Sequence, residues 1–288
     1  MQQLIKFFAI VCLSTSGIRM SYAIDLQPGD VIAPKPGISA LQLSYQYSEK
    51  NDFYKHGEKV AAARAFNSSI YVARVGHSFE VGQLPAYIYA QTAAGAVHPQ
   101  GLSGDSGMTD TTLALALWPY ANRETKTYLG TAFYLMLPTG IYDSSRAFNM
   151  GENRYKVAAQ IGYEAPFSEK LAGMVAFDAV WHGDNNDAPL PRRHQKLEQD
   201  ALYTAQVGAR YDFNPQYSLT GTYYYTFGGE TSYEGLEQNN PIRLQRYQVS
   251  GIGNYAFGRI TLQYSRDLKT ENGYFEDDRV TVRYTVRF

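Results

Sequence analysis

A period-two alternation of apolar and polar residues recurs along nearly the whole chain and constrains its fold more than any other feature. It is clearest at the end, where arginine or threonine at every second position separates Val280, Val282, Tyr284, Val286 and Phe288. Successive side chains of a strand point to opposite sides, so this pattern predicts strands with one apolar and one polar face. The alternation recurs in residues 41–47, 155–165, 203–213 and 217–227.

Alternation alone is also typical of soluble β-sandwiches, and the placement of aromatic residues favours a membrane barrel instead. The chain has 25 tyrosines and 14 phenylalanines. Many of them fall at the ends of apolar faces, as the interfacial girdle of a membrane barrel requires. They include Tyr45, Tyr47, Tyr155, Tyr163, Tyr203, Tyr211, Phe213, Tyr217 and Phe227.

Loop lengths predict the topology of about twelve strands. We place them at residues 37–48, 67–79, 84–95, 109–120, 126–137, 153–165, 171–183, 201–213, 217–228, 244–256, 259–270 and 278–288. The connections alternate between short turns and long polar loops. The expected fold is therefore an all-β, antiparallel, up-and-down transmembrane barrel with short periplasmic turns and long extracellular loops.

The N-terminus has the features of an export signal. Lys6 precedes a short apolar stretch, and Ser21-Tyr22-Ala23 supplies small residues for cleavage after Ala23. Residues 1–23 are thus predicted to be a cleaved signal peptide. Residues 24–36 contain prolines that cannot donate to a strand ladder and are predicted to be a periplasmic lead-in, and residues 37–288 the barrel.

Composition argues against several classes of function. The formal charge of −1 and the scattered basic residues do not favour a nucleic-acid partner. Cys12, the only cysteine, lies within the predicted signal peptide, so no disulfide or thiolate metal site is expected. His77 and Ser78 are adjacent on a strand, where they would point to opposite faces. We therefore predict no catalytic, cofactor or metal site, and no enzyme.

The polar face of the strands would line the lumen of such a barrel. About twelve strands enclose a narrow passage, and its lining would be mixed in charge. The candidate lining residues are Arg154, Lys156, Glu164, Asp178, Arg210, Asp212, Arg246, Asp267, Arg279, Arg283 and Arg287. Either they form only the polar interior that any small barrel needs, or some of them act on a solute. On the second interpretation, Arg154, Arg210, Arg246 and Arg283 attract small anions.

The start of the predicted mature chain carries a family resemblance. Residues 25–30, Asp-Leu-Gln-Pro-Gly-Asp, are followed by residues 33–37, Ala-Pro-Lys-Pro-Gly, and then by the first alternating strand. This arrangement resembles the family described as putative MetA-pathway phenol-degradation proteins. The resemblance implies an outer-membrane barrel associated with uptake of aromatic compounds, and it brings no catalytic residues.

The expected function is a passive outer-membrane channel or transporter for small solutes, with aromatic compounds as one class, through a narrow charged lumen. A lipid-hydrolase-like barrel and a surface adhesion or docking barrel are the alternatives. The expected partners are outer-membrane lipid, a small solute and the outer-membrane assembly machinery. The last is expected because the chain ends at Phe288 on an apolar-out strand, which resembles the signature that this machinery recognises.

Overall fold

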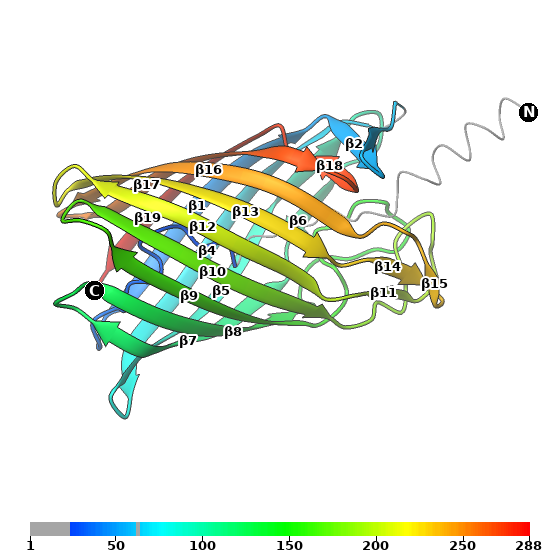
Figure 1. The fold of residues 1–288 in the computed structure, drawn as a ribbon. Coiled ribbons are helices and arrows are strands. Elements are labelled where there is room, and N and C mark those ends of the chain that lie inside the picture. The colour runs from blue at the N-terminus through cyan, green and yellow to red at the C-terminus, as the bar shows by residue number, and fades with distance from the viewer. Residues whose placement is uncertain (1–23, 62–63) are drawn as a thin grey trace, which may run out of the picture.

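A barrel of twelve long antiparallel strands makes up most of the computed structural model, which describes residues 24–61 and 64–288 (Figure 1). These strands are β1 (Ser39–Lys50), β4 (Phe66–Val81), β5 (Leu84–Pro99), β7 (Thr111–Asn122), β8 (Thr127–Leu137), β9 (Lys156–Pro166), β10 (Leu171–His182), β12 (Leu202–Asp212), β13 (Tyr217–Gly228), β16 (Ile242–Tyr255), β17 (Gly258–Thr270) and β19 (Asp278–Arg287). Each pairs with its neighbours along the chain, and β1 pairs with β19. The predicted up-and-down barrel is confirmed.

The seam between the first and last strands shows how the alternation fixes the register. Tyr45 of β1 lies opposite Val282 of β19, which in turn lies opposite Leu262 of β17. All three side chains are exposed on the outer surface of the protein. A shift by one residue would turn these apolar side chains inward, so the apolar face and the register specify each other.

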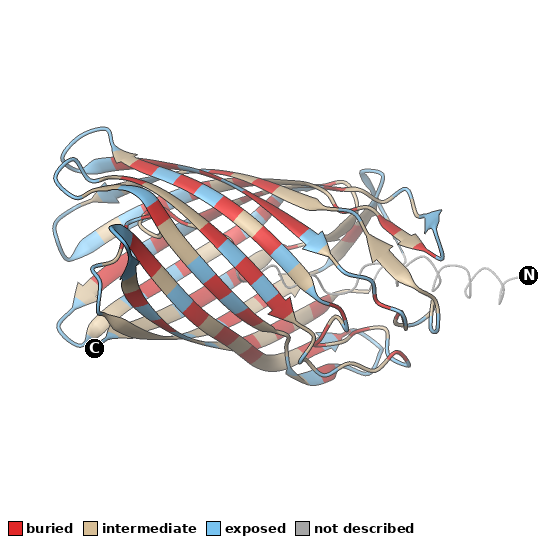
Figure 2. Ribbon diagram, turned by 90° about the horizontal axis from the view of Figure 1, so that it is seen from below, coloured by how far each residue is buried: buried red, intermediate tan, exposed pale blue. Residues whose placement is uncertain are grey.

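The outer surface of the barrel carries an apolar belt and the inner face is buried. Exposed and buried residues alternate along the strands as bands of contrasting colour in Figure 2. Within lipid, no water is available to hydrogen-bond the unpaired backbone groups of a strand edge. Closure of the ladder leaves no such edge. The belt includes Leu43, Tyr71, Val75, Ile88, Phe133, Val157, Ile161, Val175, Val207, Leu219, Val249 and Val280.

Short turns join the strands at one end and long loops at the other. In the turn from β4 to β5, Gly82 has a φ of 64°, which a residue without a Cβ adopts at little cost. The long loops contain further short strands that the sequence did not predict. They are β2 (Asp52–Lys55), β3 (Glu58–Lys59), β6 (Asp105–Met108), β11 (Leu197–Gln199), β14 (Thr231–Tyr233), β15 (Leu236–Glu237) and β18 (Gly273–Phe275).

An irregularity in β7 bears on the lumen. The pairing of β7 with β8 shifts between Leu117 and Tyr120, around Pro119. Proline has no N–H to give to a ladder, so a bulge is one of the few places where a strand tolerates it. Trp118, beside it, is directed inward and buried.

No helix long and apolar enough to span a membrane occurs in residues 24–61 or 64–288. The predicted signal peptide, residues 1–23, lies outside the described residues.

Candidate functional site in the barrel lumen

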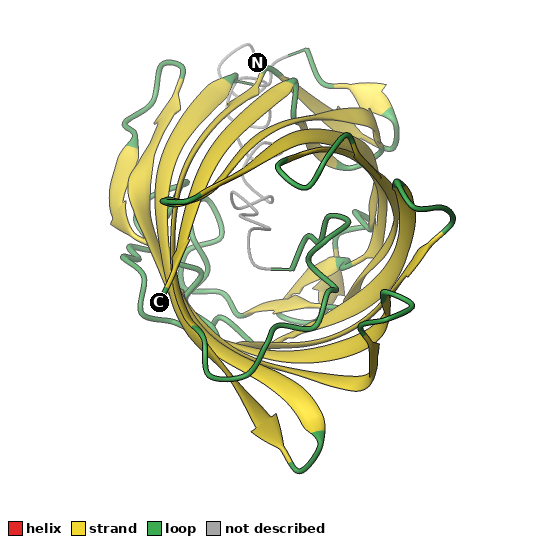
Figure 3. Cartoon of the chain, turned by 90° about the vertical axis from the view of Figure 1, so that its left-hand side faces the viewer, coloured by secondary structure: helices red, strands yellow, loops and turns green. Residues whose placement is uncertain are grey.

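Residues 24–36 run inside the barrel. Ile24, Gln27 and Val31 are buried, and the segment contacts strands on several sides of the wall. The view along the barrel shows chain within the ring of strands (Figure 3). The sequence predicts this segment as a periplasmic lead-in, and the structure places it in the lumen.

Three side chains at the turn end of the barrel bind the carbonyl groups of the segment. Trp118 Nε1 donates to the carbonyl of Val31 at 2.7 Å. Arg123 Nη2 donates to the carbonyl of Pro34 at 2.8 Å, and Ser78 Oγ to that of Lys35 at 2.6 Å. These three carbonyl groups thus find their donors in side chains of the barrel wall.

Deeper in the lumen, a carboxylate holds the turn around Gly29. Glu164 Oε2 accepts the Gly29 N–H at 2.6 Å, while Glu164 Oε1 pairs with Arg210 Nη1 at 2.6 Å. Arg210 also pairs with Asp212 at 3.1 Å. Burying a charge is costly unless it is paired and hydrogen-bonded. Here Arg210 pairs with the Glu164 carboxylate, and the Gly29 N–H of the segment donates a hydrogen bond to it.

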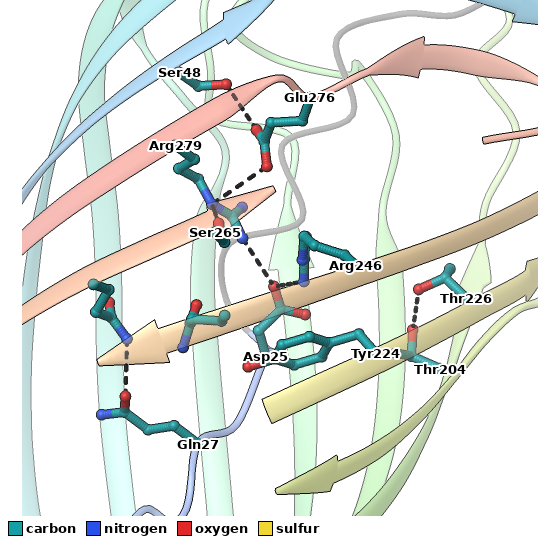
Figure 4. Close-up of polar contacts among 12 residues, drawn as sticks. Asp25, Gln27, Ser48, Thr204, Tyr224, Thr226, Arg246, Ser265, Glu276 and Arg279 are labelled. Carbon is teal, nitrogen blue, oxygen red and sulfur yellow. Dashed lines mark hydrogen bonds and ion pairs between the residues drawn. The ribbon is translucent and has the colours of Figure 1, made fainter. Parts of the chain in front are cut away.

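Asp25 joins two arginines of the wall in the cluster shown in Figure 4. Its carboxylate pairs with Arg246, and Arg279 Nη2 lies 3.9 Å from Asp25 Oδ2. Arg279 Nε pairs with Glu276 at 3.4 Å, and Glu276 accepts a hydrogen bond from Ser48 Oγ at 2.7 Å. The segment thus supplies an anion to an arginine-rich region of the wall.

Neutral hydrogen bonds complete the contacts near Asp25. Tyr224 donates its hydroxyl to the carbonyl of Leu26 at 2.7 Å, and Gln206 Oε1 accepts the Leu26 N–H at 2.9 Å. Gln263 Nε2 donates to Gln27 Oε1 at 3.0 Å. Both polar groups of the Leu26 backbone are satisfied by side chains of the barrel, as a buried peptide requires.

At the loop end, residues 138–155 fold into the mouth of the barrel. Phe148 and Met150 pack against the inward-facing Phe66, Ile70 and Val97. The rings of Phe148 and Phe66 have centroids 5.6 Å apart. The lumen is therefore narrowed from both ends, by the N-terminal segment at one and by this loop at the other.

Ionic contacts anchor the same loop. Asp105 pairs with Arg146 and accepts the Met150 N–H at 3.0 Å.

Nearby, Glu152 pairs with Arg154 at 2.8 Å and with Lys156. Burial works to raise the pKa of the Glu152 carboxyl, but Lys156 and Arg154 outweigh burial and hold that pKa well below its usual value.

Pairing within this network changes the expected anion-attracting set. Arg154 is bound to Glu152, Arg210 to Glu164 and Arg246 to Asp25. A second group of inward-facing arginines is different: among the described residues, no carboxylate oxygen lies within 4.0 Å of their guanidinium nitrogens. We call this group the free-arginine wall; it consists of Arg74, Arg259, Arg283 and Arg287.

The free-arginine wall comes from three strands, β4, β17 and β19, and β1 lies between β4 and β19. Arg74 of β4 and Arg259 of β17 lie at one level, separated by Gln42 of β1 and Thr285 of β19. Arg283 and Arg287 flank Thr285 along β19. The free-arginine wall therefore concentrates positive charge on one side of the barrel, where Asp30 of the luminal segment acts on Arg259 and Arg283 from beyond 4.0 Å.

The remaining sequence-predicted residues are two buried aspartates. Asp178 accepts hydrogen bonds from Gln206 Nε2 at 2.6 Å and from Gln160 Nε2 at 3.3 Å. Asp267 accepts the N–H of Glu276 at 2.8 Å. Sequence reasoning missed Asp25, Arg74, Arg259 and Trp118. An excess of inward arginines over inward carboxylates on the strands was the signal that an anion comes from elsewhere.

The histidine–serine pair points to two sides of the wall. His77 is exposed and lies 3.0 Å from Ser39 Oγ, while Ser78 is buried and donates to the carbonyl of Lys35. Within the described ranges, no group of three or more His, Cys, Asp or Glu side chains is arranged to hold a metal ion.

A closed twelve-stranded barrel with an apolar outer belt and a charged, partly filled lumen defines an integral protein of the outer membrane. The family model described as "Putative MetA-pathway of phenol degradation" matches residues 42–284. The chain belongs to this family.

Solved structures agree with this assignment. The chain is 31% identical to the COG4313 outer membrane channel from Pseudomonas putida F1, with a TM-score of 0.87, over 92% of this chain and 100% of that one. The translocator domain of the autotransporter NalP from Neisseria meningitidis shares the fold at 10% identity and a TM-score of 0.53, over 88% and 90%. A mutant of the TodX monoaromatic hydrocarbon channel does so at 10% identity and 0.50, over 89% and 91%. No curated protein sequence matches the chain.

Proposed function

We propose that the protein is a non-enzymatic, passive channel for small solutes with a preference for small anions. The observation that carries this proposal is the free-arginine wall. Guanidinium groups remain charged at physiological pH, and in a narrow lumen their field is screened less than on an open surface. Arginines neutralised by carboxylates, such as Arg210, would contribute little to such a preference.

The geometry of the wall also suits an aromatic solute. The Arg74 guanidinium lies over the ring of Tyr89, 4.2 Å from its centroid, and Gln91 Oε1 accepts from Arg74 Nη2 at 2.7 Å. A guanidinium can thus stack on the ring of an aromatic solute, while neighbouring arginines attract the negative charge of that solute. Together with the phenol-degradation description of the family, this favours aromatic carboxylates and phenolates as solutes.

Outer-membrane lipid and the assembly machinery are the proposed partners of the outer surface. The exposed belt offers lipid an apolar face that includes Val75 and Val282. Phe288, at the end of the chain, is 72% exposed beside the closing strand. This exposed aromatic side chain is the feature that an assembly receptor would bind.

The test compares two double variants that remove equal positive charge. Arg259→Gln with Arg283→Gln changes the free-arginine wall, whereas Arg243→Gln with Lys269→Gln changes exposed residues around Glu271 in the loop region. In planar bilayers under a salt gradient, the wild type and the loop variant should give the same anion-selective reversal potential. The wall variant should shift it toward zero and slow benzoate flux into proteoliposomes. Equal reversal potentials and equal flux in all three folded proteins would refute the proposal.

A further inference from the structure

Ile24, the first described residue of the luminal segment, packs into an apolar cluster of the barrel wall. Its side chain is buried in an apolar cluster with residues from the β5, β7, β8, β9 and β10 side of the wall. The cluster consists of Tyr89, Ala114, Ala132, Tyr134, Met136, Ala158 and Val180. This cluster positions the start of the segment at a defined place in the lumen.

Two amide side chains connect this position to Asp178. Gln160 Nε2 donates to the carbonyl of Ile24 at 2.6 Å and lies 3.3 Å from Asp178 Oδ1. Gln206 Nε2 donates to Asp178 Oδ1 at 2.6 Å, and Gln206 Oε1 accepts the Leu26 N–H at 2.9 Å. The backbone of Ile24 and the Asp178 carboxylate therefore share a donor.

Asp178 lacks a cation. Its residue is 3% exposed, and within the described part of the chain no Lys, Arg or His nitrogen lies within 4.0 Å of its carboxylate. The nearby Asp25 is already paired with Arg246 and approached by Arg279. A buried carboxylate without a counter-charge is costly, and a cation beside it would remove that cost.

We propose that Asp178, with Gln160 and Gln206, is the binding site for the α-ammonium group of Ile24. The group arises when the peptide bond between Ala23 and Ile24 is hydrolysed at the predicted cleavage site. Water supplies the hydroxyl of the new Ala23 carboxylate, and the freed Ile24 nitrogen takes up protons as an ammonium. The positive charge thus exists only in the processed chain, and cleavage completes the docking of the segment.

The test follows the reactivity of the Ile24 amine in the purified, processed barrel. Folded protein is treated near neutral pH with an N-hydroxysuccinimide ester of acetic acid, and mass spectrometry of the N-terminal peptide gives the acetylation rate. The wild-type amine should react at least about tenfold more slowly than in the urea-unfolded chain, because a buried group reacts only when it opens. Asp178→Asn should abolish most of this protection.

Asp267→Asn is the matched control. Asp267 is also 3% exposed and also lacks a cation within 4.0 Å among the described residues, but its recorded partners are Glu276 and Thr270 rather than residues 24–36. It should leave the amine protected. A glycine inserted before Ile24 keeps Asp178 but displaces the ammonium, and should expose it to the reagent.

The proposal is overturned if the mature chain does not begin at Ile24, or if the wild-type amine reacts at the unfolded rate. It is also overturned if the glycine insertion or Asp178→Asn, in folded and heat-modifiable protein, leaves the amine as protected as Asp267→Asn does. If the wild-type amine reacts at the unfolded rate, the site is refuted even where a variant fails to fold. None of these readouts depends on the solute that the channel passes.

Discussion

Trp118 of the barrel wall and Val31 of the luminal segment are joined by a hydrogen bond of 2.7 Å from the indole Nε1 to the carbonyl oxygen. Trp118 is directed inward beside the bulge at Pro119. A tryptophan has a single donor, and here that donor is used on the segment rather than on the wall. The contact connects a defect in one strand to the chain that fills the lumen.

Trp118→Phe should loosen the segment and raise single-channel conductance. The smaller phenyl ring leaves space beside the segment, and the bond to Val31 is lost at a cost of about 1 kcal/mol. We expect larger and noisier current steps in planar bilayers.

The control is the other tryptophan of the chain, Trp181, which is exposed on the outer surface of β10. Trp181→Phe should leave conductance unchanged. Equal conductance of the two variants would contradict a restraining role for Trp118.

Val282→Arg should destabilise the barrel by roughly 2–4 kcal/mol, because it places a charge in the lipid-facing belt. Val282 is 44% exposed on the outer face and lies between Tyr45 and Leu262. Urea titration of the refolded protein in lipid vesicles measures the loss. Val282→Leu, which keeps an apolar side chain there, should fold as the wild type does. A fully tolerated arginine would show that this face does not meet lipid.

Glu276 should make stability fall in acid. Burial acts to raise the pKa of its carboxyl, but Arg279, Lys50 and Arg246 outweigh burial and hold the pKa well below the ordinary 4.5. A depressed pKa in the folded state contributes stability that is present above pH 4.5 and is lost as pH falls through the folded value.

Glu276→Gln should therefore lower the melting temperature at pH 7 and flatten its decline below pH 4.5. Thermal scans across this range measure both effects. Glu124→Gln is a suitable control, since Glu124 is exposed in a turn and has no Lys, Arg or His nitrogen within 4.0 Å among the described residues. If the melting temperatures of Glu276→Gln and the wild type fall in parallel below pH 4.5, Glu276 is not the source of the acid sensitivity.

Asp105→Ala should release the loop of residues 138–155 from the mouth of the barrel. Asp105 binds both Arg146 and the Met150 backbone, and its side chain is 1% exposed. Trypsin should cut after Arg146 about tenfold faster in outer-membrane vesicles of the variant, since cleavage follows local opening. Asp52→Ala, which breaks the pair with Lys59 in a different loop, should leave that rate unchanged.

Much of the wall could be predicted from the sequence, because each strand repeats one physical rule. The strand predicted at 217–228 coincides with β13, and those predicted at 126–137 and 259–270 differ by one residue at their starts from β8 and β17. Apolar residues must face lipid at every second position, so the alternation identifies both the strand and the side of it that faces lipid.

The contents of the lumen could not be predicted in the same way. Alternation assigns Arg246 to the inner face but does not say that Asp25, more than two hundred residues away, will pair with it. Residues 24–36 have no period, and their prolines argue only against a ladder. The short strands of the loops, such as β2 and β18, pair across distant segments and carry no lipid-facing pattern.

Apart from the chain itself, which continues into β1, the luminal segment is held by hydrogen bonds and ion pairs from side chains of the barrel. Within the described residues, no backbone-to-backbone hydrogen bond joins residues 24–36 to a barrel strand. The barrel, by contrast, is one closed ladder of backbone hydrogen bonds. We therefore expect two units of different cooperativity: a luminal segment that mild denaturant releases reversibly, and a barrel that stays folded without it. Titration should resolve these as two separate transitions, the first of them without loss of β-structure.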